Sequence, residues 1–115
     1  MKQLKKHRSI ADQDRELLTR CRTAIKSVEP SAEVILYGSR ARGDAEQESD
    51  YDFLILTDGE VSLKREDAFR RQLYPLELET GAVFTVILVS RADWGSALCD
   101  AMPFYRNVER DGIML

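Results

Sequence analysis

A glycine-serine pair followed by two arginines has the residue types that bind a phosphate group. Gly38 and Ser39 come directly after an apolar run at residues 33–37, and Arg40 and Arg42 follow them. Glycine lets the backbone approach a ligand closely, and the first turn of a helix offers free amides and a positive dipole end to an anion. Arginine adds forked donors for phosphate oxygens. We therefore expect a phosphate site here, with Ser39 as the N-cap of a helix, although such a turn is common when it occurs alone.

Two aspartates spaced one residue apart supply oxygen ligands for a hard cation. Asp50 and Asp52 stand at the start of a second apolar run, residues 51–56, and residues two apart on a strand point to the same face. Two carboxylates crowded there repel each other and lose solvation unless a cation lies between them, and Mg²⁺ or Mn²⁺ suits such ligands. We expect Asp50 and Asp52 to hold the metal, with Tyr51 and Phe53 facing the core. Phosphate and metal side by side are what phosphoryl or nucleotidyl transfer requires.

Length and composition predict one globular domain over residues 1–115. The chain has 32% charged residues and a net charge of −3, and a general nucleic-acid binder would usually be basic, so no long nucleic acid is expected. No apolar run is long enough to span a membrane, and neither a signal peptide nor a disulfide framework is predicted, which makes the cytoplasm the expected location. Cys21 and Cys99 are interpreted as reduced, mostly buried thiols. The basic run at residues 5–8 is interpreted as a solvated helix end or tail, and His7, the only histidine, gives no support for a zinc site.

Hydrophobic periodicity predicts the order helix, strand, strand, helix, strand, helix. The expected strands are residues 33–37, 51–56 and 82–89, and the expected helices cover residues 11–28, start at Ser62, and run from Pro103 to Gly112. Ser90 is expected to cap a further short helix, Pro75 to kink or end the helix that Ser62 begins, and Leu78 to belong to the apolar face of that helix. Both faces of the last strand are expected to be buried, with residues 113–115 as an apolar tail against the core. This order argues for an α/β (α+β) fold with a small mixed β-sheet flanked by helices.

The complete pattern is Gly-Ser, then ten residues (40–49), then Asp-x-Asp. It resembles the signature of the DNA polymerase β-like nucleotidyltransferase superfamily, in particular the minimal nucleotidyltransferases, which are about as long as this chain. The likeness extends to the continuation Arg-Ala-Arg-Gly-Asp and to residues 104–112. It implies a polymerase β palm-like fold in which Gly38 and Ser39 hold the tail of a nucleoside triphosphate, with ATP the expected one. The same likeness makes Arg40 and Arg42 phosphate partners, and it makes Asp50 and Asp52 the catalytic ligands of Mg²⁺ or Mn²⁺.

The resemblance also implies a reaction, in which a hydroxyl of a partner macromolecule attacks the α-phosphate and pyrophosphate leaves. Many minimal nucleotidyltransferases act with a small helical HEPN protein, as antitoxin and toxin, and some transfer AMP to a tyrosine of that toxin. Active members usually carry a third carboxylate on the next central strand, whereas residues 82–89 contain no Asp or Glu, and Thr85 is their only polar residue. Glu77 or Glu79 is a candidate substitute, although both are more simply interpreted as surface helix acids. Two interpretations stay open: an enzyme, and a catalytically weak or silent nucleotide-binding or antitoxin module that acts by contact.

Overall fold

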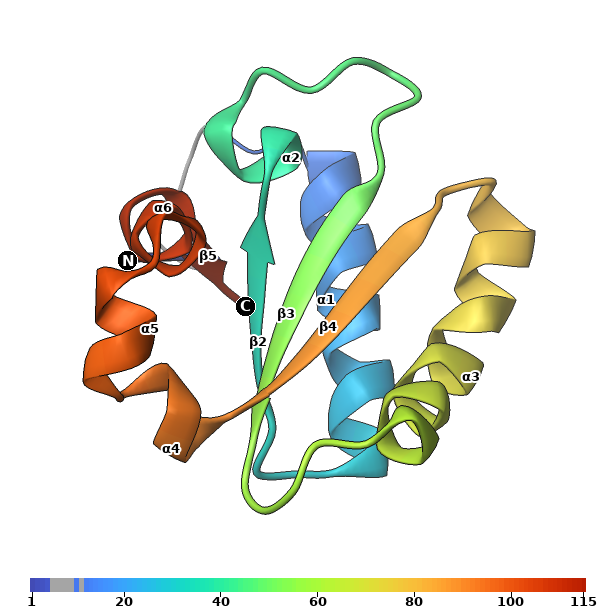
Figure 1. Ribbon diagram of the computed structural model, residues 1–115. Helices are drawn as coiled ribbons and strands as arrows, with labels where there is room; N and C mark the ends of the chain where they lie inside the picture. The colour runs from blue at the N-terminus through green and yellow to red at the C-terminus, as the bar shows by residue number, and fades with distance from the viewer. Residues whose placement is uncertain (5–9, 11) are drawn as a thin grey trace.

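The computed structural model describes residues 1–4, 10 and 12–115, and these form a five-stranded mixed sheet with helices packed against it (Figure 1). The basic run at residues 5–8, with His7, lies outside the described residues. The strands are β1 (Lys2–Gln3), β2 (Glu33–Tyr37), β3 (Tyr51–Thr57), β4 (Phe84–Ser90) and β5 (Ile113–Met114). The helices are α1 (Asp12–Val28), α2 (Ser39–Arg42), α3 (Leu63–Thr80), α4 (Arg91–Trp94), α5 (Ala97–Ala101) and α6 (Pro103–Asp111). The fold class predicted from the sequence is confirmed.

The order of the strands across the sheet is β1-β5-β2-β3-β4. Strands β2 and β3 are antiparallel and place Tyr37 opposite Asp52. Strands β3 and β4 are parallel and place Thr85 opposite Asp52 on the other side. Because directly opposed residues point to the same face of a sheet, Tyr37, Asp52 and Thr85 form one row across three strands. Figure 1 looks onto the face of the sheet that carries this row, with α1 and α3 behind it.

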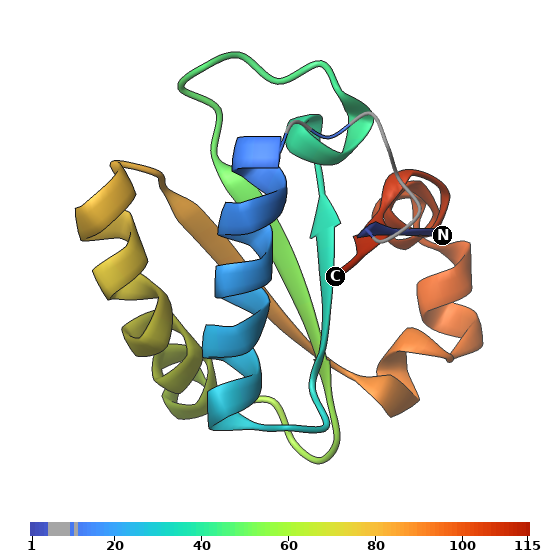
Figure 2. The ribbon, with the colours of Figure 1, turned by 180° about the vertical axis from the view of Figure 1, so that it is seen from behind.

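The main core lies between the opposite face of the sheet and the helices α1 and α3, which are in front in Figure 2. Helix α1 buries residues at helical spacing, and α3 does the same from the other side; the buried side chains are Leu18, Cys21, Ile25, Phe69, Leu73 and Leu76. They meet Phe53 and Ile55 of β3, both fully buried. Each large apolar side chain buried in this way contributes about 1.5–3 kcal/mol. The prediction that Tyr51 and Phe53 face the core is therefore confirmed, and both cysteines are buried and free.

Helix α3 continues past Pro75, so of the two predicted effects of this proline, a kink or an end of the helix, the end is wrong. The helix continues to Thr80, where Gly81 ends it with a left-handed φ of 74°. A proline inside a helix costs about 3 kcal/mol, because it removes one backbone hydrogen bond and its ring crowds the preceding turn. Leu73 and Leu76 on either side of it are both buried, and their packing helps to offset this cost. Leu78 instead points to solvent with 69% of its surface exposed, so its assignment to the buried face is also wrong.

Strand β4 is the outermost strand of the sheet rather than a strand buried on both faces. It begins at Phe84, two residues later than expected, and its face on the side of Asp52 is only partly covered. Ile87 on that face is 37% exposed. The reason is that α5 and α6 lie on the side of β2 and β5, away from the middle of β4 (Figure 1).

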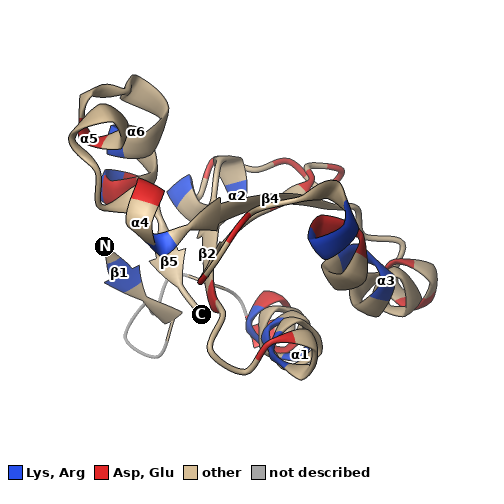
Figure 3. Ribbon diagram, turned by 60° about the horizontal axis from the view of Figure 1, so that its bottom comes forward, with Lys and Arg blue, Asp and Glu red and all other residues tan. Residues whose placement is uncertain are grey.

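The outer edge of β4 is covered by side chains of α3 rather than by another strand. Helix α3 carries both acidic and basic residues along its length (Figure 3). Three of its side chains bond the edge backbone: Phe84 N–H donates to Glu77 Oε2 at 3.0 Å, Arg70 Nη2 donates to the Val86 carbonyl at 3.2 Å, and Leu88 N–H donates to Glu66 Oε1 at 3.4 Å. An unpaired strand edge invites pairing with other chains, and these bonds block it.

The C-terminal layer contains two elements that the sequence pattern did not predict, the helix α5 and the strand β5. Ser90 caps α4 as predicted, through a bond of 3.1 Å from Asp93 N–H to its hydroxyl. The apolar tail expected at residues 113–115 enters the sheet as β5, between β1 and β2. Gly112 permits this sharp entry, because a Cβ there would lie 2.5 Å from the Val108 carbonyl oxygen and 2.8 Å from Ile35 Cγ2.

Candidate functional site

The Asp52 carboxylate lies directly against the glycine turn that was predicted to bind phosphate. Gly38 has φ 75° and ψ −158°, a backbone conformation that is essentially restricted to glycine. A Cβ added to Gly38 would lie only 2.3 Å from Asp52 Oδ2. The structure thus brings Asp52 of the predicted metal pair against Gly38 of the predicted phosphate turn, and it shows that glycine is required at position 38 because the carboxylate fills the adjacent space.

The glycine turn opens a helix of a single turn, and its cap differs from the prediction. Gly38 itself is the N-cap of α2, no side chain caps the helix, and Ser39 is its first residue. The expectation that the Ser39 hydroxyl caps this helix is therefore wrong. The Gly38 carbonyl accepts hydrogen bonds of 3.1 Å from the N–H groups of both Ala41 and Arg42. Because α2 is so short, any anion here would be bound by individual amides of the first turn rather than by a long helix dipole.

Arg40 holds the loop that leads from α2 to β3. Its Nη2 donates to the carbonyls of Ser49 at 2.9 Å and Gln47 at 3.1 Å, and its Nε donates to Ser49 at 3.2 Å. The guanidinium also lies over the ring of Tyr51, 4.3 Å from the centroid. The contact of Arg40 with phosphate stays a prediction. In this structure its guanidinium N–H groups hold the backbone of the loop that leads to Asp50.

Asp50 and Arg42 are both exposed at the rim of the site. Asp50 immediately precedes β3, and Arg42 pairs with the loop carboxylate of Asp44 at 3.2 Å. Within the described residues, no group of three or more His, Cys, Asp or Glu side chains could enclose a metal ion. The donor set nonetheless fits Mg²⁺, which proteins commonly bind through one or two carboxylates while substrate phosphates and water supply the remaining oxygens.

Neither glutamate that was considered as a third carboxylate lies beside Asp52. Glu77 accepts the hydrogen bond from Phe84 N–H at the outer edge of β4, and Glu79 pairs with Arg20 of α1. The residue of β4 that does lie beside Asp52 is Thr85, whose hydroxyl donates to Asp52 Oδ1 at 2.5 Å. A neutral donor therefore occupies this position.

Tyr37 is a member of the site that the sequence reasoning did not identify. Its ring lies on the same face as Asp52 and contacts Phe104 edge-on, with 5.4 Å between ring centroids. Burial, together with the negative charge of Asp52 as a smaller cause, raises the pKa of Tyr37 to about 12, and a hydrogen bond with Thr85 acts in the opposite direction. Tyr37 is therefore a neutral phenol at physiological pH. The available sequence signal was its position at the end of β2, where an antiparallel register places it opposite Asp52.

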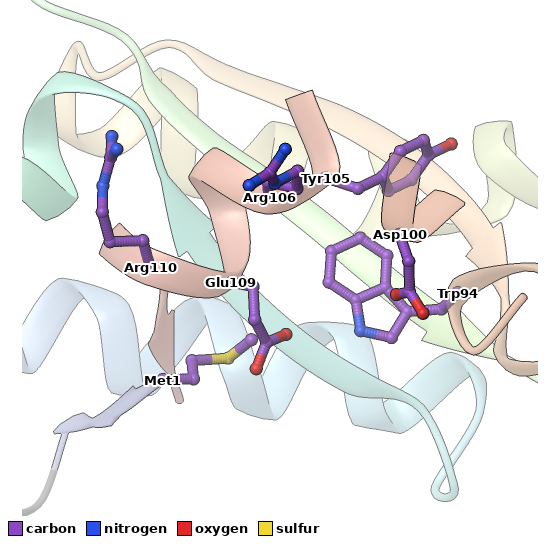
Figure 4. A pocket seen from close by; sticks show the side chains of 7 residues that line it. All are labelled: Met1, Trp94, Asp100, Tyr105, Arg106, Glu109 and Arg110. Carbon is purple, nitrogen blue, oxygen red and sulfur yellow. The ribbon is translucent and has the colours of Figure 1, made fainter. Parts of the chain in front are cut away.

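Surface cavities also lie away from Asp52. One of 430 Å³ lies on the C-terminal layer, where Figure 4 shows the Trp94 ring on its wall; its lining residues are Met1, Trp94, Asp100, Tyr105, Arg106, Glu109 and Arg110. A second, of 690 Å³, lies on the side of Arg40 and Tyr51. Asp52 lines neither of them, so the candidate site is identified by the contacts of Asp52 and not by either of these cavities.

A mixed sheet that presents a carboxylate beside a glycine turn, backed by two helices, places the chain in the class of nucleotidyltransferase folds. The sequence profile of the family named nucleotidyltransferase domain matches residues 18–111. The chain therefore belongs to the nucleotidyltransferase domain family, which confirms the resemblance seen in the sequence.

A solved toxin-antitoxin structure shows the same fold. A toxin-antitoxin structure with AMP-PNP matches with a TM-score of 0.56 and 18% identity, over 84% of this chain and 69% of that one. A structure of Cid1 poly(U) polymerase with MgGTP bound matches with a TM-score of 0.47 and 31% identity, over 57% of this chain. Another Cid1 structure, concerned with its RNA terminal uridylyl transferase activity, matches with a TM-score of 0.47 and 21% identity, over 89% of this chain. This chain spans 22% and 38% of the two Cid1 chains. No curated protein matches, and no helix in the described part of the chain has both the length and the apolar character needed to cross a membrane.

Proposed function

We propose that residues 1–115 form one Mg²⁺-dependent nucleotidyltransferase domain that transfers a nucleoside monophosphate from a nucleoside triphosphate to a hydroxyl of a partner macromolecule. The observation that carries this proposal is the contact between the Asp52 carboxylate and the Gly38 turn. It unites a ligand for a hard cation with backbone amides suited to an anion, and phosphoryl transfer is catalysed chiefly by such positioning and charge stabilisation. The family to which the chain belongs supports the same activity.

Each residue of the site has a role in this proposal. The backbone of Gly38 and Ser39 binds the triphosphate tail, of ATP in the first instance, and the exposed Arg42 extends over its oxygens. Asp50 and Asp52 hold the divalent ion, Mg²⁺ or Mn²⁺, which when bound neutralises phosphate charge and aligns the reacting groups. Arg40 acts indirectly, by fixing the loop that presents Asp50.

The acceptor in this proposal belongs to another protein. A small helical partner of the HEPN type, with this chain as its antitoxin in the cytoplasm, is the partner we propose. The resemblance of the sequence motif to minimal nucleotidyltransferases supports it, and the likeness in fold to a toxin-antitoxin structure is consistent with it.

Calorimetry with ATP or GTP in the presence of Mg²⁺ tests nucleotide binding. The wild-type protein should bind, and Asp52→Asn and Asp50→Asn should each weaken binding about tenfold, which corresponds to about 1.4 kcal/mol. Asp44→Asn is a matched control, because Asp44 is an exposed acid of the same loop. Absence of binding by the wild type, or equal affinity in all three variants, would contradict the proposal.

A second candidate function is a nucleotide-binding module that neutralises its partner by contact without catalysis. Thr85 favours it, because the position beside Asp52 on β4 holds a hydroxyl where an enzyme would gain from a further carboxylate. Transfer of label from ATP carrying a radioactive α-phosphate to a co-expressed partner separates the two candidates. Label that appears with the wild type and disappears with Asp52→Asn establishes the enzyme, and its absence with a partner that still binds establishes the silent module.

A further inference from the structure

Thr85 makes a direct contact with the central carboxylate of the site. We propose that Thr85 is a positioning residue, which turns the Asp52 carboxylate so that Oδ2, rather than Oδ1, is offered to the cation on the side of the Gly38 turn. The inference rests on the proposed function, and it assigns which atom of Asp52 binds the metal and which residue decides this.

The contact constrains a torsion that is otherwise soft. The last torsion of an aspartate side chain is broad, so an unsupported carboxylate samples many orientations. Thr85 Oγ1 donates to Asp52 Oδ1 at 2.5 Å, the short distance typical of a hydroxyl bonded to a charged oxygen. With Oδ1 held, Oδ2 lies against the backbone of Gly38.

The donor is itself held in place by the sheet. Thr85 lies opposite Asp52 in the parallel pair of β3 and β4, and its neighbours along the strand, Phe84 and Val86, also pair with β3. Threonine is branched at Cβ, so its first torsion has few accessible positions and the direction of its hydroxyl is restricted. Thr85 is also half-buried, which strengthens the bond relative to one in open solvent.

The direction of Oδ2 determines where a cation and an anion can meet. A single fixed carboxylate oxygen suits Mg²⁺, which requires nearly octahedral geometry and takes its other ligands from water and phosphate. Since Oδ2 faces the turn at Gly38, Asp52 would hold the ion through this oxygen, on the side of the amides that would bind the phosphates. Loss of the Thr85 hydroxyl should therefore lower the affinity for nucleotide in the presence of metal. The affinity for nucleotide without metal, which depends on the Gly38 turn, should stay unchanged.

The test compares the affinity for a non-hydrolysable ATP analogue with Mn²⁺ and without metal in EDTA, using the ratio of the two affinities as the readout. Thr85→Val removes the hydroxyl at nearly constant shape, and Thr85→Ser keeps it. Ile87→Val is the control, because Ile87 is the next residue on the same face of β4. Thr85→Val should lower the ratio at least fivefold, whereas Thr85→Ser, Ile87→Val and the metal-free affinity of every variant should stay within twofold of the wild type.

The other results overturn the inference in distinguishable ways. An unchanged ratio in Thr85→Val, together with a collapsed ratio in Asp52→Asn, refutes the role of Thr85 and leaves the proposed function standing. A wild-type protein whose affinity does not depend on Mn²⁺ refutes both. A Thr85→Val protein that loses metal-free binding and melting temperature together shows a structural role only, and Thr85→Ala serves as the hydroxyl-free variant if Thr85→Val does not fold.

Discussion

Replacing Gly38 with alanine should destabilise the protein by about 2.5–6 kcal/mol, because two penalties act at once. The first is backbone strain, since the φ of 75° and ψ of −158° lie in a region that costs other residues about 1–3 kcal/mol. The second is displacement of Asp52. The new Cβ would lie 2.3 Å from Asp52 Oδ2, about 1 Å closer than ordinary van der Waals contact permits. Moving the carboxylate away breaks its bond with Thr85, and hydrogen bonds to charged groups contribute about 1.5–3 kcal/mol.

Urea and thermal unfolding measure this cost, and a melting temperature lower by roughly 10–24 °C is expected for a domain of this size. Gly43→Ala separates the two penalties. Gly43 also has a positive φ, of 83°, but a Cβ there would meet nothing within 4 Å, so strain alone should cost about 1 kcal/mol. Combining Gly38→Ala with Asp52→Ala should recover at least about 1 kcal/mol in a double-mutant cycle. If Gly38→Ala costs no more than Gly43→Ala, or if the cycle shows no coupling, the crowding between Gly38 and Asp52 is refuted.

Three further perturbations test other parts of the structure. Pro75→Ala restores a helix hydrogen bond inside α3 and should raise the free energy of unfolding by about 1–3 kcal/mol in urea titrations; a loss of stability would show that the ring packs productively. Glu77→Ala leaves Phe84 N–H without its acceptor and should cost about 1–2 kcal/mol, with more aggregation in light scattering, whereas Glu77→Gln should retain most of the stability. The pKa of Tyr37, raised from 10.0 to about 12, predicts a stability contribution that is full below pH 10 and lost as the pH rises toward 12; Tyr37→Phe should flatten this alkaline loss, and an unchanged profile would contradict it.

The parts of the fold that follow local rules could be predicted from the sequence. The helix at α1 and the strands β2 and β3 lie where apolar periodicity placed them, because one face of each is buried against the same core. The path of α3 through Pro75 could not be predicted, since the packing on either side of the proline depends on the sheet and on α1. Strand β5 was missed for a similar reason: two residues have no periodicity of their own, and only pairing with β1 and β2 makes them a strand.

The candidate site, like the fold, has some features that could be predicted from the sequence and others that could not. The alternation of β3 predicted correctly that Tyr51 is buried on the face opposite Asp52. The approach of Asp52 to Gly38 depends on β2 pairing antiparallel with β3, which motif spacing suggests but cannot demonstrate. Thr85 could be noted as the lone polar residue of its strand, yet its bond to Asp52 required the parallel register of β4. Tyr37 belongs to no motif in the sequence, and only its position opposite Asp52 in the antiparallel pair of β2 and β3 identifies it as part of the site.

The place of β5 has a consequence for how the protein folds during synthesis. Residues 113 and 114 lie between β1 and β2, and Leu115 N–H donates to the Val34 carbonyl at 2.9 Å. In the part of the chain that the structure describes, strand β1 pairs only with β5, which in turn pairs with β2. On the ribosome, the N-terminal strand must therefore wait, unpaired, while more than a hundred further residues emerge. Helix α1 and the strands β2 to β4 can assemble earlier, so the nascent chain should pass through a stage with an organised centre and an open edge at β2, which the last few residues close.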